Sequence, residues 1–435
     1  MSSKGGTYQS VLLIASLCGC ATSQQATGSG STGDPAATGA SQPSGDGTTI
    51  KLLNGKIEID EQIRNYAALY EEQYGVRVEV ESVAGADVTT YLTSYLVSGE
   101  MPDIFYFGGE SDYQILKEYM ADLSDQSWAE ETFATFTGEN GEVVGFPYAV
   151  EGFGMVYNAD ILNQAGIDPA GLTTIDAYRA AFETLESKKE ELGIDAPVSM
   201  ASSIATGCSW ITGMHQTGIY LGQGLEADDD SLLQLMKEGK VDKERLNQYA
   251  EWEALICQYA DPYVLQSGSY DEQIALWATG KTAFICQGNW IDPSVASYNI
   301  DFECGIASPA FSKEETEGII VFPPSWWAIY KDTPNMEVCK DFLDNIAHTE
   351  EGQQCLVVDC GMVSPFDFCQ LAPDAPLAKS LMNWVSTGKT YPWYANAMPS
   401  GMDASIAAIY ELLANGTIDA QGFSDQVESL VAGNS

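Results

Sequence analysis

The chain has 435 residues, 45% of them hydrophobic, which is enough for a large buried core and makes more than one domain the natural expectation. Its 62 acidic residues outweigh 19 Lys and Arg and give a net charge of −43, so its surface repels nucleic acid and anionic membranes. The only histidines, His215 and His348, are far apart in sequence. They offer little to a zinc site or a histidine-based triad, and no metal or cofactor is expected.

The first residues are typical of a bacterial export signal. Lys4 precedes an apolar stretch, residues 11–17, that is too short to span a bilayer. The letters LCGC at residues 17–20 resemble the lipobox of bacterial lipoproteins, which implies a signal peptide of residues 1–19 and a lipid on Cys20. Two acyl chains there would anchor the protein durably. The alternative is an ordinary secretory signal with an incidental cysteine.

A flexible tether, residues 20–47, follows the signal. From residue 21 to residue 49 the sequence contains no Leu, Ile, Val, Met or aromatic residue, so this segment cannot collapse into a core. Random-coil scaling gives it an r.m.s. reach of about 30 Å. The sequence therefore predicts a folded body held at the outer face of the cell membrane through Cys20.

Strand-like and helix-like segments alternate after the tether. In the order strand, helix, strand, helix, strand they are residues 49–53, 60–74, 76–80, 88–97 and 102–107. This alternation predicts βαβ units and a mostly parallel sheet, hence an α/β fold. Ligands of such sheets bind beyond the carboxyl ends of the strands. Those ends are residues 54–56, 82–87 and 108–110.

Eight cysteines lie beyond the signal. An even number in an exported protein permits disulfides, but their connectivity cannot be read from the sequence, and free thiols fit equally well. No CxxC spacing occurs, so thioredoxin-like or metal chemistry has no support. We find no internal repeat.

Four later stretches carry a family resemblance. They are GEMPDIFYF (99–107), GFPYAVEGFGMVYNADIL (145–162), LWATGKTAFICQGNW (276–290) and SWWAIYKDTPNMEVCKDFLDNI (325–346). Together with the lipobox and tether, their order and spacing over roughly residues 48–430 resemble the extracellular solute-binding protein family 1 of ABC importers, the family of the maltose-binding protein. Each stretch alone is a weak signal.

The resemblance implies a two-lobed periplasmic-binding-protein fold. Each lobe would hold a mostly parallel sheet flanked by helices, with crossover segments and a hinge that closes the lobes around a ligand. It assigns residues 48–150 and 288–325 to the first lobe, and residues 151–287 and 326–435 to the second. Crossovers are expected near residues 149–151, 287–289 and 324–326.

The resemblance also suggests ligand-binding residues. A sugar offers apolar ring faces and a rim of hydroxyls, which aromatic rings, carboxylates and amides can recognise. Trp290 stands where sugar-binding relatives often stack a tryptophan on a ring, with Asn289 beside it, and Glu151 lies at a crossover. The other candidates from strand ends are Phe107, Glu110 and Asn54. Each has a plainer alternative as a core, turn or rim residue.

Weaker candidates lie farther along the chain. Trp210 stands where the second lobe of the family contributes aromatic residues, and the segment after residue 390 supplies Trp393, Tyr394, Met402 and Asp403. Strand alternation sends Trp326 and Trp327 to opposite faces. We expect Trp326 to face the cleft and Trp327 to pack inside the second lobe.

These observations favour a binding protein rather than an enzyme. We expect a monomer that captures a carbohydrate, an oligosaccharide by preference, in its cleft and delivers it to a membrane permease. The ATPase would be a separate protein, since no GxxxxGK[ST] motif occurs here. A cationic ligand such as a polyamine, or a peptide, is the main alternative, because acidic residues abound. A secreted glycosidase with paired carboxylates about 5–9 Å apart is a remote one.

Overall fold

The computed structural model describes residues 47–83, 88–132, 134–226 and 229–433. The predicted signal peptide, Cys20 and the predicted tether up to residue 46 lie outside these ranges, as do residues 84–87 at the second predicted strand end. Within the described ranges, none of the helices has both the length and the apolar character that crossing a bilayer requires. All eight cysteines beyond the signal are described, and all are free thiols.

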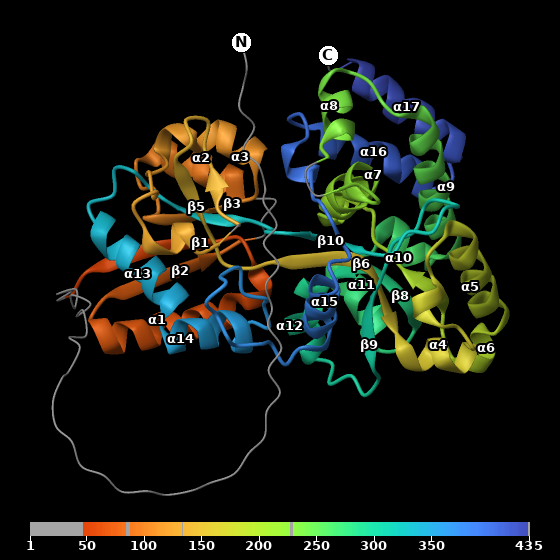
Figure 1. Cartoon of the computed structure of the whole chain (residues 1–435), viewed down its shortest axis with the longest axis horizontal. Helices are drawn as coiled ribbons and strands as arrows, with labels where there is room; N and C mark the ends of the chain where they lie inside the picture. The colour runs from red at the N-terminus through yellow and green to blue at the C-terminus, as the bar shows by residue number, and fades with distance from the viewer. Residues whose placement is uncertain (1–46, 84–87, 133, 227–228, 434–435) are drawn as a thin grey trace, which may run out of the picture.

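The chain folds into two lobes, each built on a six-membered set of strands with helices on its faces (Figure 1). The first sheet has the spatial order β2 (Arg77–Ser82), β1 (Thr49–Asn54), β3 (Ile104–Phe107), β11 (Trp326–Ile329), β5 (Val143–Pro147) and β4 (Phe136–Thr137). The helices of this lobe are α1 (Asp60–Tyr74), α2 (Val88–Ser98), α3 (Glu110–Leu116), α13 (Met336–His348) and α14 (Glu350–Gln353).

The second sheet has the order β12 (Thr390–Tyr391), β10 (Ile319–Phe322), β6 (Glu151–Asn158), β8 (Thr282–Gly288) and β7 (Ala196–Ser199), with β9 (Cys304–Ala307) also paired to β6. Its helices up to α10 are α4 (Ala159–Ala165), α5 (Ile175–Ser187), α6 (Lys189–Leu192), α7 (Thr217–Gly222), α8 (Ser231–Lys237), α9 (Lys243–Tyr259) and α10 (Pro262–Ser267). The remaining ones are α11 (Tyr270–Ala278), α12 (Asp292–Ala296), α15 (Pro376–Ser386), α16 (Met402–Ala414) and α17 (Ala420–Gly433).

Local sequence explains why these elements form where they do. In α1 the residues Ile63, Tyr66 and Tyr70 recur at helical spacing and are buried, and the helix ends at Gly75, whose φ of 69° suits glycine. Helix α11 begins with a capping box in which the side chains of Ser269 and Glu272 each accept a backbone N–H from the other residue.

Both sheets are mixed, which corrects the expectation that each is mostly parallel. Strand β1 pairs in parallel with β2 and β3, as the predicted βαβ order requires, but β11 runs antiparallel to β3 and β5. In the second sheet, β6 runs antiparallel to β8, β9 and β10. The antiparallel partners arise because strands that leave a lobe and strands that enter it lie side by side.

The predicted lobe division is wrong after residue 287. Residues 288–325 contain β9 and β10, which pair with β6 and therefore belong to the second lobe. After β10 the chain returns to the first lobe only at β11, so the predicted crossover at 287–289 lies inside the second lobe. The chain changes lobe near residues 149–150, at 323–325 and again between 363 and 376. Val150 and Val363, at the first and third of these crossovers, form an isolated bridge.

The two neighbouring tryptophans point to opposite faces of the first sheet. Trp327 is fully buried and stacks on Tyr148, with ring centroids 4.6 Å apart, in the core that also contains α1 and α13. Trp326 packs on the other face against Phe107 and Phe136, and its indole N–H donates to the Ala134 carbonyl at 2.6 Å. The predicted alternation is confirmed, but Trp327 is in the first lobe, contrary to expectation.

Candidate functional site

A cavity of about 760 Å³ lies between the two lobes. Its first-lobe side is formed by the loops beyond the carboxyl ends of β1 and β3, where ligands of such sheets are expected. Its second-lobe side is formed by a π-helix at Ile211–Gln216, the start of α11, the turn after β8 and residues 393–404. Pro324 and Ser325 of a crossover complete the lining.

The first-lobe side presents mainly polar side chains. They include Lys56, Glu58, Thr89, Tyr106, Ser111 and Asp112. Asp112 is held in place by two donors, because its carboxylate accepts the Gly108 N–H at 2.7 Å and the Thr89 hydroxyl at 2.6 Å. Gly55 lets the Tyr106 ring lie against the backbone, since a Cβ at this glycine would fall 2.4 Å from the ring.

A buried ion-pair triad joins the two sides. The Lys56 ammonium, after β1, lies 2.6 Å from the Glu151 carboxylate at the start of β6 and 3.0 Å from the Glu58 carboxylate. Burial alone would lower the pKa of Lys56, but Glu151 and Glu58 outweigh it, so the pKa lies well above its ordinary value. Burial raises the pKa of Glu151, and the Lys56 ammonium opposes that shift. Lys56 is therefore charged at neutral pH.

The second-lobe side presents a wall of aromatic rings, which we call the aromatic wall. It consists of Trp210, His215, Tyr270, Trp290, Phe322 and Trp393. Trp393 stacks on Phe322 with ring centroids 4.2 Å apart and planes 15° from parallel. Trp290 stacks on Phe153 of β6 and donates its indole N–H to Gln287 at 2.8 Å, so strand residues fix its ring.

His215 lies at the centre of the aromatic wall. Its ring centroid is 4.8 Å from that of Trp290, 5.1 Å from that of Trp210 and 5.2 Å from that of Trp393. Burial lowers its pKa to about 4, so the ring is neutral at pH 7. Nδ1 lies 3.2 Å from the Trp210 carbonyl, which can only accept, so Nδ1 carries the proton and Nε2 is left as an acceptor.

The lobes also approach each other at the rim of the cavity. Gly109, before α3, adopts a φ of 143°, and a Cβ there would fall 2.8 Å from the side chain of Asn396 in the second lobe. Glycine is needed at this position both for the backbone conformation and for the close approach. The lobes are therefore in contact beside the cavity.

Five of the predicted binding residues line the cavity. They come from the second lobe or the crossover that opens it, and they are Glu151, Trp210, Trp290, Trp393 and Asp403. Trp290 is only 7% exposed, so a small part of its ring faces the cavity. Trp393 and Asp403 were among the weaker candidates from the sequence.

Two predicted aromatic residues of the first lobe do not line the cavity. Trp326 and Phe107 stack on each other inside the first lobe, with ring centroids 5.6 Å apart, and Phe107 is completely buried. The expectation that Trp326 faces the cleft is wrong. Both faces of the first sheet are covered, so the side that Trp326 takes leads into a second layer of core rather than into the cleft.

The other predicted polar residues shape the turns around the cavity without lining it. Asn54 donates to the Lys56 carbonyl at 2.7 Å and to the Ser82 hydroxyl at 3.1 Å. Asn289 accepts the Gly152 N–H at 2.8 Å, and Glu110 accepts from Gln114 on its own helix at 2.7 Å. Tyr394 also falls outside the lining, although both of its chain neighbours belong to it.

Several lining residues escaped the sequence analysis, above all Lys56, Tyr106, His215 and Phe322. Lys56 lies within the predicted first strand end, residues 54–56, so the strand end was a usable signal for it, whereas Tyr106 lies inside the predicted third strand, next to the candidate Phe107. No pattern singled out His215, because a lone histidine in a helical region usually has a structural role.

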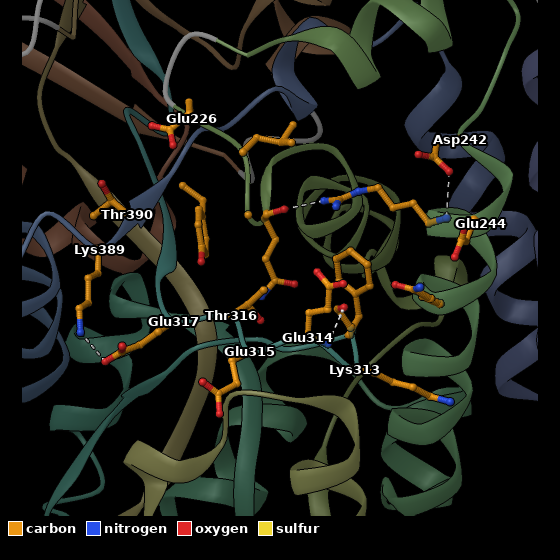
Figure 2. Close-up of a pocket in the computed structure, with 18 of the residues that line it drawn as sticks. Glu226, Asp242, Glu244, Lys313, Glu314, Glu315, Thr316, Glu317, Lys389 and Thr390 are labelled. Carbon is orange, nitrogen blue, oxygen red and sulfur yellow. Dashed lines mark hydrogen bonds and ion pairs between the residues drawn. The ribbon is translucent and has the colours of Figure 1, made fainter.

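A second cavity of about 740 Å³ lies wholly within the second lobe (Figure 2). Some of its charged groups are engaged: Lys389 pairs with Glu317 at 2.6 Å, and Asp242 caps α9 by accepting the Arg245 N–H at 3.0 Å. The Arg245 guanidinium donates to the carbonyls of Tyr220 and Gln223. Lobe movement cannot enclose this cavity, so the one between the lobes is the candidate site.

Comparison of the sequence with known proteins identifies its relatives. A model of a bacterial extracellular solute-binding protein family matches residues 65–382. The chain is 23% identical over 307 residues to the melibiose/raffinose/stachyose-binding protein MelE of Bacillus subtilis, an alignment covering 67% of this chain and 68% of that protein. It is 21% identical over 276 residues to a multiple sugar-binding protein of Streptococcus mutans, covering 61% of this chain and 63% of that protein.

Solved structures confirm the two-lobed fold. A sugar transporter protein of Bacillus licheniformis in complex with stachyose aligns with a TM-score of 0.70 at 20% identity, covering 89% of this chain and all of the other. RafE in complex with raffinose aligns with a TM-score of 0.67 at 17% identity, again over 89% and 100% of the two chains. At these identities the likeness establishes the fold.

Proposed function

The chain belongs to the bacterial extracellular solute-binding protein family, and we propose that it captures a neutral oligosaccharide in the inter-lobe cavity for an ABC importer. The observation that supports this ligand most directly is the aromatic wall facing polar groups of the other lobe. Sugar rings stack on aromatic rings through their C–H faces, while their hydroxyls need acceptors and donors around the edge.

The size and chemistry of the cavity suit such a ligand. A volume of about 760 Å³ falls within the usual range of about 300–1,000 Å³ for small-molecule sites. Trp393 and Trp290 would provide stacking surfaces, and the ring of His215 contacts both of them. Asp112 and Ser111 on the opposite side would bind hydroxyl groups.

The relatives suggest which sugars to try first. The names of the aligned proteins include melibiose, raffinose, stachyose and multiple sugars, and two aligned structures contain stachyose and raffinose. All of these are neutral. We propose a raffinose-type or similar oligosaccharide as the ligand class of this chain.

Delivery and anchoring complete the proposal. The crossovers near Val150, at 323–325 and beyond Val363 would act as the hinge on which the lobes close. A monomer tethered by lipid at Cys20 would then dock on a membrane permease outside the cytoplasm, a location that follows from the extracellular family. Replacing Cys20 by Ser should release the protein from membranes, and cell fractionation measures this.

A thermal-shift screen of the purified protein tests the ligand. We expect raffinose, stachyose or melibiose to raise the melting temperature, because a ligand at 100 times its Kd stabilises the folded state by about 2.7 kcal/mol. Putrescine, a tripeptide and galacturonic acid serve as cationic, peptide and anionic comparisons. A response only to putrescine or to the peptide would contradict the proposal, and sugar recovered as smaller products would indicate hydrolysis.

A further inference from the structure

The ion-pair triad at the cavity joins one ammonium group to two carboxylates, and all three side chains line the cavity. Lys56 is the only Lys or Arg among the described residues that line the cavity, and both of its carboxylate partners line the cavity too. Lys56 is 8% exposed and Glu151 is 3% exposed, so their charges lie almost entirely out of water. A carboxylate as deeply buried as that of Glu151 needs a cation beside it.

A buried carboxylate without a cation is strongly destabilising, whereas one that is paired and hydrogen-bonded is tolerated. The required ammonium group could come from the protein or from a bound molecule. In this chain it comes from the protein, at 2.6 Å from Glu151. An amine ligand reaching the same point would have to bring a second positive charge next to Lys56.

We propose that the Lys56 ammonium occupies the place that a ligand amino group would otherwise take, so that it makes the cavity selective for uncharged ligands. Lys56 is then a specificity-determining residue that rejects amines. This proposal deepens the proposed function, on which its choice of a neutral sugar as the accepted ligand rests.

The other carboxylates of the cavity do not restore affinity for cations. Asp112 already accepts two hydrogen bonds from its own lobe, and Asp271 is exposed at the rim. Asp403 is half-buried beside the first turn of α16. Charges that remain in contact with water are screened and attract a cation weakly, whereas the buried Glu151 carboxylate is already paired with Lys56.

Removing the lysine side chain should convert the site into an amine site. In Lys56→Ala the missing atoms correspond to propylammonium, which we use as the probe. We expect Lys56→Ala to lower the melting temperature by several degrees, and millimolar propylammonium chloride to restore at least half of the loss. Sodium chloride at the same concentration should restore none of it, and the wild type should respond to neither propylammonium nor putrescine.

Two further variants isolate the role of the triad. Lys117→Ala removes a half-buried first-lobe lysine away from the cavity that pairs with Glu139 at 2.8 Å, and it should change little and show no rescue. In Lys56→Ala/Glu151→Gln the ammonium and the more deeply buried of its two carboxylate partners are both gone, and only Glu58 remains, so the response to propylammonium should fall sharply.

Stabilisation of the wild type by putrescine would overturn the proposal, as would an amine response of the double variant equal to that of Lys56→Ala. Equal effects of propylammonium and sodium chloride on Lys56→Ala would overturn it too. If Lys56→Ala does not fold unaided, the variant is refolded from urea with propylammonium chloride or with sodium chloride. Recovery of folded protein only with the amine supports the proposal. Failure to recover folded protein with either salt contradicts it. These results do not depend on sugar binding, whose absence would contradict only the proposed function.

Discussion

The first-lobe side of the cavity is polar and carried by strand ends and the helical turns that follow them, whereas the second-lobe side is aromatic and continuous with a core. Asp112 and Lys56 follow strand ends and are held by hydrogen bonds and ion pairs. Trp393, His215 and Trp290 contact one another or Phe322 as part of the hydrophobic cluster of their lobe.

This difference implies a division of roles in binding. Aromatic rings fixed by packing present a preformed surface that loses little side-chain entropy when a sugar stacks on it. Hydrogen-bonding groups on the opposite lobe reach the ligand only when the lobes lie close together. We therefore expect substitutions in the aromatic wall to weaken binding more than substitutions on the polar side.

The largest effect is expected for Trp393→Ala. Loss of a stacking ring should weaken binding of the responsive oligosaccharide about 30-fold, roughly 2 kcal/mol, because both buried area and ring stacking are lost. Isothermal titration calorimetry measures the change in Kd. Trp384→Ala is the matched control, since Trp384 is a half-buried tryptophan of the same lobe that donates to the Ile306 carbonyl outside the cavity. Equal weakening by both variants would contradict the predicted role of the aromatic wall.

The next effect concerns the pH dependence of stability that His215, in the aromatic wall, should confer. Burial lowers the pKa of His215 to about 4, whereas in the unfolded chain it is about 6.5. Between these values the unfolded chain binds a proton that the folded protein does not. The stability that His215 contributes is therefore complete above pH 6.5 and is lost as the pH falls towards 4.

Urea unfolding of the wild type and His215→Gln at pH 7, 6 and 5 measures this contribution. Between pH 7 and pH 5 the wild type should lose about 2 kcal/mol more of its free energy of unfolding than the variant does. The carboxylates and His348 are common to both proteins, so their titration cancels in the difference. Parallel pH profiles would contradict the lowered pKa of His215 and would mean that water solvates its ring.

The sequence predicted local features well and long-range pairings poorly. The order strand, helix, strand, helix, strand that leads to β3 follows from periodicity over short windows, and the structure confirms it. The division of the lobes after residue 287 was wrong because it depends on β10 pairing with β6, far away in sequence. No local pattern states which strand a later strand will join.

The same limit applies to the site. Alternation correctly separated Trp326 from Trp327, but it cannot tell a cleft from a second core layer when both faces of a sheet are covered. Glu151 was found from a family motif, while its partner Lys56, 95 residues earlier, was missed. The sequence around a residue does not indicate whether it forms an ion pair with a residue far away in the chain.

The smallest effect is expected on the polar side, for Asp112→Asn. The variant keeps an oxygen that can accept from Thr89 or Gly108 but loses the charge that strengthens a hydrogen bond to a sugar hydroxyl, so Kd should rise about fivefold, roughly 1 kcal/mol. Glu110→Gln is the matched control, because Glu110 lies two residues away on the same helix and bonds to Gln114 instead of lining the cavity. Calorimetry should show no change for this control. A larger loss for Asp112→Asn than for Trp393→Ala would reverse the proposed roles, since it would make the polar side the main source of affinity and the aromatic wall mainly a support for the fold.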